Sequence, residues 1–139
     1  MAVELGKSYV EGHQGAEDGH DLSERRKASA CLKHYIGYSG SANGRDRTPA
    51  YIPEITLREY YLPTFAHAVA AGVSTVMVNS GTVNSIPGHA NSFYINDILK
   101  GELKFDGLVV SDREDIKRLH TRDCIAETPE HAVRSEVKK

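Results

Sequence analysis

The chain has 139 residues, of which 40% are hydrophobic and 26% are charged, and its formal net charge is −2. This composition suits one packed domain and argues against a disordered chain, while the balance of 17 basic and 19 acidic residues argues against a nucleic-acid-binding protein. No apolar run reaches the roughly 20 residues of a membrane-spanning helix. Cys31 and Cys124 form neither a metal-binding spacing nor a disulfide framework, and Cys31 is expected in the core.

The first half of the chain predicts a helix, a strand and a long loop, in that order. Apolar residues at helical spacing indicate a helix over 2–12, and a polar loop follows over 13–24. The segment 28–36 is largely apolar and predicts a buried strand. Residues 37–53 are rich in Gly, Ser, Asn and Pro and therefore predict a long loop, a kind of segment that is often functional.

The second half continues the alternation of helices and strands. A helix is expected from Thr56 to about Ala71, with Pro63 kinking or splitting it. The β-branched segment 73–79 predicts a second strand. The remaining expectations, in chain order, are a turn-rich loop over 80–91, a helix over 92–103, a strand over 105–111, a polar stretch, and a last helix capped by Thr128.

This order predicts an α/β fold with a parallel sheet. Strands that are apolar throughout are typical of parallel sheets buried on both faces, and right-handed helical crossovers connect such strands. Three strands alone would leave two unpaired edges lined with apolar residues. The pattern therefore predicts a part taken from the middle of a larger α/β architecture.

Polar or soft side chains gather where each predicted strand ends. Lys33 and His34 stand at the end of the first strand, Met77 near the end of the second, and Asp112 just beyond the third. Active sites of parallel α/β folds and β/α barrels form at the carboxyl ends of the strands. We therefore expect these side chains to lie along one rim.

Each of these residues has a functional and a structural interpretation. Asp112 could attack an electrophilic carbon, bind a metal or accept hydrogen bonds from a hydroxylated ligand; alternatively, it caps the segment that follows. Lys33 and His34 could bind sugar hydroxyls or a phosphate, or could simply face solvent and pack. The chain has no HExxH or CxxC motif and no glycine-rich phosphate loop, so neither metal catalysis nor a nucleotide cofactor is predicted.

Three ordered motifs carry a family resemblance. CLKHYIGYSG, TLREYYLPTFAHAVAAGVSTVMVNSGTVNSIPGHAN and LKGELKFDGLVVSD resemble the barrel domain of glycoside hydrolase family 3, the family of many β-glucosidases. The resemblance implies that residues 1–139 are a partial N-terminal barrel domain, with about three parallel β/α units from the middle of a TIM-type (β/α)8 barrel. It also implies a hydrolase that acts on a β-linked glucoside or oligosaccharide without a cofactor.

The resemblance assigns roles residue by residue. Asp112 matches the nucleophile that forms a covalent glycosyl-enzyme, and Lys33 and His34 match the pair that binds the sugar preceding the cleaved bond. Met77 matches a residue lining that subsite, and Arg118 matches an arginine near the leaving group. Lys33 beside Asp112 would keep the carboxylate ionised.

The chain also departs from the family pattern. Arg113 stands where the family often has Trp, and Ser80 where it often has Tyr. The acid/base residue that a retaining exo-acting glycosidase needs would come from the missing remainder of the barrel and the second domain, so the fragment alone is expected to be inactive. The alternative function is a non-catalytic carbohydrate-binding or interaction module. The family would place the parent enzyme in a secreted, periplasmic or lysosomal setting.

Overall fold

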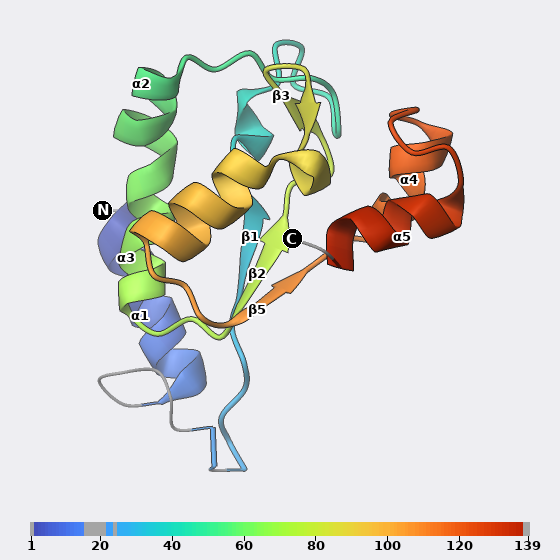
Figure 1. The fold of residues 1–139 in the computed structure, drawn as a ribbon. Helices are drawn as coiled ribbons and strands as arrows, with labels where there is room; N and C mark the ends of the chain where they lie inside the picture. The colour runs from blue at the N-terminus through green and yellow to red at the C-terminus, as the bar shows by residue number, and fades with distance from the viewer. Residues whose placement is uncertain (1, 16–21, 24, 138–139) are drawn as a thin grey trace.

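The computed structural model describes residues 2–15, 22–23 and 25–137 as five helices of ordinary geometry, four further helical segments and five strands (Figure 1). None of the helices in these described ranges is long and apolar enough to cross a membrane. The elements in chain order are α1 (Ala2–Gln14), β1 (Cys31–Tyr35), η1 (Tyr38–Gly40), α2 (Glu54–Thr56), η2 (Leu57–Tyr61), α3 (Leu62–Ala70), β2 (Thr75–Val78), β3 (Thr82–Val83), β4 (Ile86–Pro87), η3 (Gly88–Ala90), η4 (Phe93–Glu102), β5 (Leu108–Val110), α4 (Asp115–Thr121) and α5 (Pro129–Val137).

The three longer strands form a parallel sheet, as the sequence predicts, and their order in the sheet is β1-β2-β5. Their register places Leu32 beside Val76 and Val76 beside Val109. Within the turn-rich loop expected over 80–91, the structure forms a small antiparallel hairpin, β3 and β4. Parallel strands joined through helices confirm the α/β class and give a TIM-barrel-type domain.

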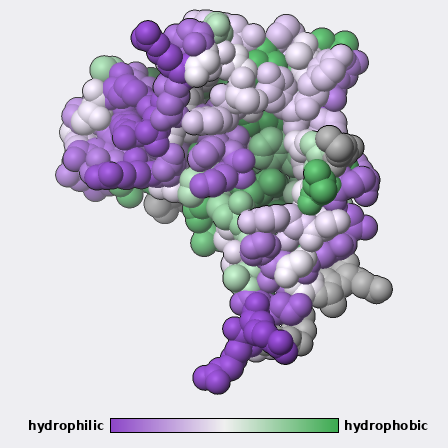
Figure 2. Space-filling model, turned by 180° about the vertical axis from the view of Figure 1, so that it is seen from behind, coloured by the Kyte–Doolittle hydropathy of each residue, from purple (hydrophilic) through white to green (hydrophobic). Residues whose placement is uncertain are grey.

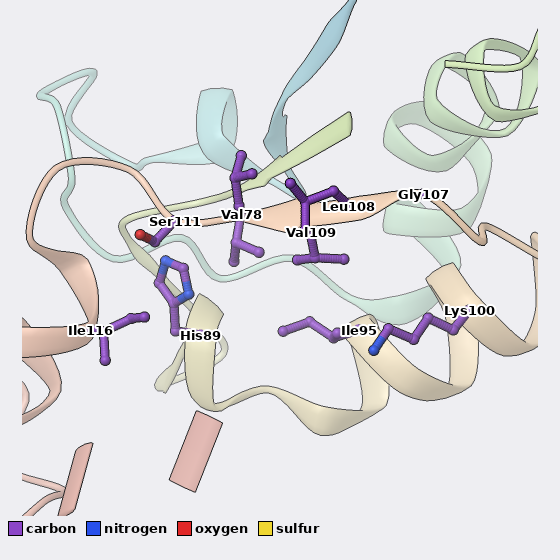
Figure 3. Close-up of a pocket in the computed structure, with 10 residues that line it drawn as sticks. Val78, His89, Ile95, Lys100, Gly107, Leu108, Val109, Ser111 and Ile116 are labelled. Atoms are coloured by element: carbon purple, nitrogen blue, oxygen red, sulfur yellow. The ribbon is translucent and has the colours of Figure 1, made fainter. Parts of the chain in front are cut away.

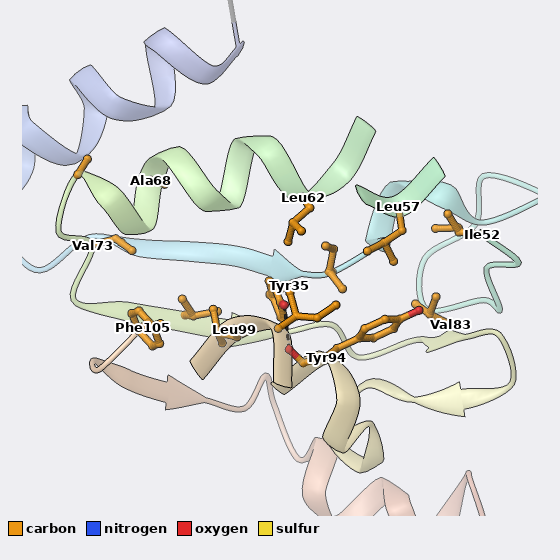
Figure 4. Packing of buried hydrophobic residues seen from close by; sticks show 14 of the residues in the cluster. Tyr35, Ile52, Leu57, Leu62, Ala68, Val73, Val83, Tyr94, Leu99 and Phe105 are labelled. Atoms are coloured by element: carbon orange, nitrogen blue, oxygen red, sulfur yellow. Dashed lines mark hydrogen bonds between the residues drawn. The ribbon is translucent and has the colours of Figure 1, made fainter. Parts of the chain in front are cut away.

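The main core lies between the sheet and the helices on one of its faces (Figure 4). Leu32 and Val109 pack against this core, in which Val76, Leu57 and Leu99 are fully buried. In Figure 4, Leu62 of α3 and Leu99 of η4 both point toward the strands. One helix-covered face is therefore enough to hold the strand ends in place.

The opposite face of the sheet lies outside the helix-packed core. Cys31, Thr75 and Leu108 share one register position, and Leu108 is 64% exposed. Cys31 is exposed as well, so the expectations of a core cysteine and of strands buried on both faces are wrong. Figure 2, the view from behind, shows apolar side chains gathered in the middle of the molecule with hydrophilic ones around them. A barrel strand presents one face to the helices and the other to the interior.

The helix before β2 is divided as Pro63 predicts. Pro63 lies in the first turn of α3, directly after the wide π-type turns of η2, because proline cannot donate the backbone hydrogen bond of a regular helix. Thr56 makes no cap; the helical segment begins at Glu54 after Pro53.

Two other helix boundaries differ from expectation. Helix α1 passes through Gly12 and ends at Gln14. Helix α4 lies in the polar stretch for which no element was predicted. Only Asp115 and Leu119 of this helix are buried, and its many charged residues give no apolar periodicity that would indicate a helix. The last helix does begin at Pro129, and Thr128 Oγ1 accepts a hydrogen bond from the His131 amide at 3.1 Å.

Gln14 ties the end of α1 to the amino ends of two strands. The side chain is fully buried, and its Oε1 accepts hydrogen bonds from the Ala30 amide at 2.9 Å and from the Ser74 amide at 3.0 Å. The Ser74 hydroxyl donates to the same oxygen at 2.8 Å, and Gln14 Nε2 donates to the Gly72 carbonyl at 2.7 Å. This one amide therefore satisfies three backbone groups in the two segments that lead into β1 and β2.

We predict that Gln14→Leu lowers the free energy of unfolding by roughly 2–4 kcal/mol, because buried donors and an acceptor lose their partners. Urea denaturation followed by circular dichroism measures the change. Glu11→Ala on the same helix is the control, since it removes an exposed ion pair with Lys7 (3.6 Å) and should cost under about 1 kcal/mol. Equal losses in the two variants would contradict this role of Gln14.

Candidate active site

Asp112 lies two residues beyond β5, where three donors from different segments meet its carboxylate. Oδ2 accepts hydrogen bonds from Arg47 Nη2 at 2.8 Å and from Ser80 Oγ at 3.1 Å. Oδ1 accepts one from the Arg113 amide at 2.6 Å. The Arg113 amide, then the Arg47 guanidinium and the Ser80 hydroxyl, lower the pKa of Asp112 to about 2, against partial burial. The group is thus an ionised carboxylate at neutral pH, and its side chain is 23% exposed.

The cation beside Asp112 is Arg47, where Lys33 was expected. Arg47 comes from the long loop after β1, and its guanidinium also faces Asp46, with Nη1 at 3.4 Å from Oδ2. Because β2 separates β1 from β5, a side chain on β1 starts about 10 Å from the β5 rim, whereas the loop can cross that distance. Arg47 has no predicted role, and its place in a long polar loop is the only local sign of one in the sequence.

Lys33 and His34 line a cavity of about 360 Å³ together with Tyr38, Tyr61 and Phe65. The rings of His34 and Tyr38 lie against each other with centroids 4.6 Å apart. Asp112 is not among the residues that line this cavity. The expected basic pair and the carboxylate therefore belong to two adjacent parts of the rim.

A chain of polar contacts joins these two parts. The Tyr38 hydroxyl donates to Asp46 Oδ1 at 2.7 Å, Asp46 faces Arg47, and Arg47 donates to Asp112. His34 contacts the ring at the start of this chain. The loop between β1 and α2 thus couples the cavity of Lys33 and His34 to the Asp112 carboxylate.

The other two predicted residues occupy different surroundings. Met77 is half-buried in β2 and pairs in register with Val110 of β5. Arg118 lies on α4, where its Nη1 donates to Asp115 Oδ1 at 2.8 Å. Arg118 therefore forms its ion pair with the buried Asp115, and Asp112 forms its ion pair with Arg47.

Ser80 and Asp115 form further contacts behind Asp112 that sequence reasoning missed. Ser80 is buried in the loop after β2, and its hydroxyl reaches Asp115 Oδ2 as well as Asp112. Its carbonyl accepts a hydrogen bond from Arg122 Nη2 at 2.6 Å. Although Ser80 is much shorter than the tyrosine that the resemblance would place there, it still contacts the carboxylate of Asp112.

A second cavity, of about 380 Å³, lies beside β5 and is mostly apolar (Figure 3). Val78 and Ile95 line it beside β5, and His89 and Lys100 supply its polar groups. Burial lowers the pKa of His89, so the imidazole is neutral at pH 7. The apolar lining makes this cavity a poorer match for a hydroxyl-rich sugar than the rim around Asp112. Within the described part of the chain, no three His, Cys, Asp or Glu side chains are grouped to hold a metal ion.

Comparison with known proteins gives a consistent picture. The family model described as the glycosyl hydrolase family 3 N terminal domain matches residues 1–138. The chain is 44% identical over 121 residues to a lysosomal beta glucosidase of Dictyostelium discoideum and 39% identical over 128 residues to a beta-xylosidase of Formosa agariphila. These alignments cover 86% and 91% of the chain, but 15% and 17% of the two relatives.

Solved structures agree with the sequence comparison. A β-glucosidase from Listeria innocua in complex with glucose matches with a TM-score of 0.89 at 30% identity, over 96% of the chain and 18% of that protein. A β-glucosidase from Erythrobacter marinus matches with a TM-score of 0.91 at 29% identity, over 98% and 18%. The chain thus spans less than a fifth of the length of these relatives and keeps the arrangement that the matching segment has in them.

We predict that Arg47→Met raises the pKa of Asp112 from about 2 toward its ordinary 3.8, because a charged donor to Oδ2 is lost. A ¹³C NMR titration of the carboxyl carbon measures it. Since the pKa of the folded form lies below the ordinary value, Asp112 stabilises the fold above about pH 3.8 and loses that contribution as the pH falls toward 2. The variant should therefore lose less stability between neutral and acid pH.

Arg45→Met is the matched control, because Arg45 is an exposed cation on the same loop. It should leave the Asp112 titration unchanged. An unchanged pKa in Arg47→Met, or an equal rise in both variants, would show that the ion pair with Arg47 does not contribute to the low pKa of Asp112.

Proposed function

The chain belongs to glycosyl hydrolase family 3, and from this membership and the contacts of Asp112 we propose that it is the nucleophile-bearing part of a retaining, exo-acting β-glucosidase. Residues 1–139 would be a partial N-terminal barrel domain of about three β/α units. The observation that carries the proposal is the ionised carboxylate of Asp112 at the end of a parallel strand, held by donors from three segments. The relatives named as β-glucosidases support the substrate class.

In the proposed reaction, Asp112 attacks the anomeric carbon of a β-linked glucoside. Oδ2 lies within hydrogen-bonding distance of two side-chain donors, whereas Oδ1 accepts one backbone amide and keeps a lone pair for the attack. The new bond joins Oδ1 to C1 as the bond from C1 to the leaving oxygen breaks, and the leaving oxygen takes the electron pair. In the second step a water oxygen bonds to C1 as the bond from C1 to Oδ1 breaks, which regenerates the carboxylate, and the proton lost by the water goes to the acid/base residue.

Sugar recognition is proposed for the adjacent part of the rim. Lys33 and His34 would donate hydrogen bonds to sugar hydroxyls, and Met77 would line the same subsite. Arg118 uses Nη1 on Asp115, which leaves its other guanidinium donors for the leaving-group side. Hydrogen bonds that tighten at the transition state lower the barrier, so the coupling of this cavity to Asp112 through Arg47 would serve catalysis as well as binding.

The proton donor is the missing component. A retaining glycosidase needs a second carboxyl group about 5–5.5 Å from the first. Asp46, the acid nearest to Arg47 on the loop, accepts a hydrogen bond from Tyr38 and faces Arg47, so its carboxylate is engaged in holding that loop. We propose that the acid/base residue comes from a further part of the barrel or a second domain, and that this segment alone does not turn over.

We predict that the chain does not hydrolyse 4-nitrophenyl β-glucoside but is trapped by 2,4-dinitrophenyl 2-deoxy-2-fluoro-β-glucoside. Dinitrophenolate leaves without a proton, so the trapping step needs the nucleophile and no acid. Intact-mass spectrometry should show one added fluoroglucosyl unit, and peptide mapping should place it on Asp112. Asp112→Asn should remove the adduct, and the matched variant Asp106→Asn should keep it.

Two results would contradict parts of this proposal. Adduct formation that persists in Asp112→Asn would exclude Asp112 as the nucleophile. Clear hydrolysis of the nitrophenyl glucoside that Asp112→Ala abolishes would refute the statement that the segment lacks a proton donor.

Glucose binding separates the catalytic proposal from a non-catalytic sugar-binding module. We predict weak binding of glucose by the chain in isothermal calorimetry, reduced about tenfold or more by Lys33→Ala, because a charged donor to a sugar hydroxyl is lost. Lys104→Ala is the control, since Lys104 lies outside the cavity of Lys33 and His34. Binding that depends on Lys33 without any trapping at Asp112 would favour the module.

A further inference from the structure

The described structure contains a buried acid that the proposed reaction does not use. The side chain of Asp115 is fully buried in the first turn of α4, and its Oδ1 accepts a hydrogen bond from Arg118 Nη1 at 2.8 Å. Its Oδ2 meets the hydroxyl of Ser80, and His89 Nε2 lies 3.6 Å from the same oxygen. Burying a carboxylate is costly unless donors surround it, so the groups around Asp115 hold it at a position that water cannot reach.

Ser80 stands between two carboxylates. Its hydroxyl oxygen lies 3.1 Å from Asp112 Oδ2 and also contacts Asp115 Oδ2. A hydroxyl carries one proton, so Ser80 can donate to only one of them at a time. Asp112 is partly exposed and has two other donors, whereas Asp115 is shut off from water, so the balance favours donation to Asp115.

We propose that Asp115 is a positioning residue that acts on Asp112 through the hydroxyl proton of Ser80. This inference rests on the proposed function, in which Asp112 is the nucleophile. While Ser80 donates to Asp115, the Asp112 carboxylate keeps more of its negative charge for the attack by Oδ1. When the glycosyl ester breaks and charge returns to Asp112, the hydroxyl can turn back toward it without any net proton transfer.

The surrounding contacts fit a device of this kind. Arg122 fixes the backbone of Ser80 through its carbonyl at 2.6 Å, so rotation of the hydroxyl is the remaining freedom. Arg118 fixes the other oxygen of Asp115. Both arginines lie on or directly after α4, which follows Asp112 in the chain. One short segment therefore positions the nucleophile and the acid behind it.

The substitution Asp115→Asn reverses the hydrogen bond without changing the size of the side chain. A guanidinium can only donate, so the introduced amide would turn its oxygen to Arg118 and its NH₂ group to Ser80. Ser80 would then accept from this amide and donate to Asp112 alone. A stronger hydrogen bond to the resting carboxylate weakens the nucleophile, because that charge is lost in the transition state.

The experiment measures the rate of trapping by 2,4-dinitrophenyl 2-deoxy-2-fluoro-β-glucoside in the full chain. We expect D115N to slow trapping about tenfold, the order of one charge-assisted hydrogen bond, and to have no further effect in the S80A background. D106N, which removes an exposed acid before β5, is the charge control and should match the unchanged chain. The same slowing by D115N with and without Ser80 would overturn the inference.

A second readout separates failure of this inference from failure of the proposed function. At pH 7, the ¹³C shift of the Asp112 carboxyl carbon should move in D115N and stay fixed when D115N is added to S80A. Equal movement in both backgrounds would again overturn the inference. If the unchanged chain is not trapped while the shift depends on Ser80 as expected, the proposed nucleophile fails and the hydrogen-bond switch stands.

Folding is checked by the amide NMR spectrum of each variant. Should D115N not fold, R118M answers the same question, because it removes a donor from Oδ1 of Asp115 and makes that carboxylate draw the Ser80 proton more strongly. The Asp112 carbon should then shift toward its position in S80A, where the serine donor is absent altogether, and R118M should cause no further shift in S80A. Movement of the carbon in R118M that persists without Ser80 would overturn the inference.

Discussion

The ion pair between Arg47 and Asp112 is the contact on which the arrangement of the site depends. It joins a loop that follows β1 to the end of β5 across the intervening strand, at 2.8 Å between Nη2 and Oδ2. Side chains of 34% and 23% exposure keep the pair partly shielded from water, so the charge interaction is stronger than at an open surface. Without this contact the loop after β1 would make no ion pair with Asp112, and the polar contacts that join the cavity of Lys33 to Asp112 would be broken.

The parallel sheet makes this contact possible. Because all three long strands run the same way, their carboxyl ends open on one rim, and each following loop supplies one part of the site: Arg47 after β1, Ser80 after β2, and Asp112 after β5. Gln14 fixes the opposite ends of β1 and β2 by hydrogen bonds to the backbone just before each strand. Because the amino ends of β1 and β2 are fixed to each other, their carboxyl ends, where the loops with Arg47 and Ser80 begin, are also held in place.

The sequence predicts the parts of this design that depend on local pattern. Alternating helices and strands, the split at Pro63 and the polar residue beyond β5 follow from periodicity and from the chemistry of proline. Arg47 and Asp112 are 65 residues apart in the chain, and Ser80 is 32 residues from Asp112 and 35 from Asp115. No local sequence pattern encodes contacts over such separations. The expectation for Cys31 failed for a related reason. Its apolar neighbours indicate a strand, but the helices that pack on the strand decide which of its two faces is buried, and Cys31 is exposed.

The one-sided core explains how so short a segment keeps the arrangement found in much longer relatives. Helices α3 and η4 pack with η2 on a single face of the sheet, where Val76, Leu57 and Leu99 are buried, so the strands are held in register by contacts within the segment. The uncovered face and the outer edges of β1 and β5 take no part in that core. In a closed barrel those surfaces meet further strands and the barrel interior. Residues that build the frame and residues that would meet the rest of a barrel are thus segregated on opposite faces, which allows the rim around Asp112 to form from the local frame alone.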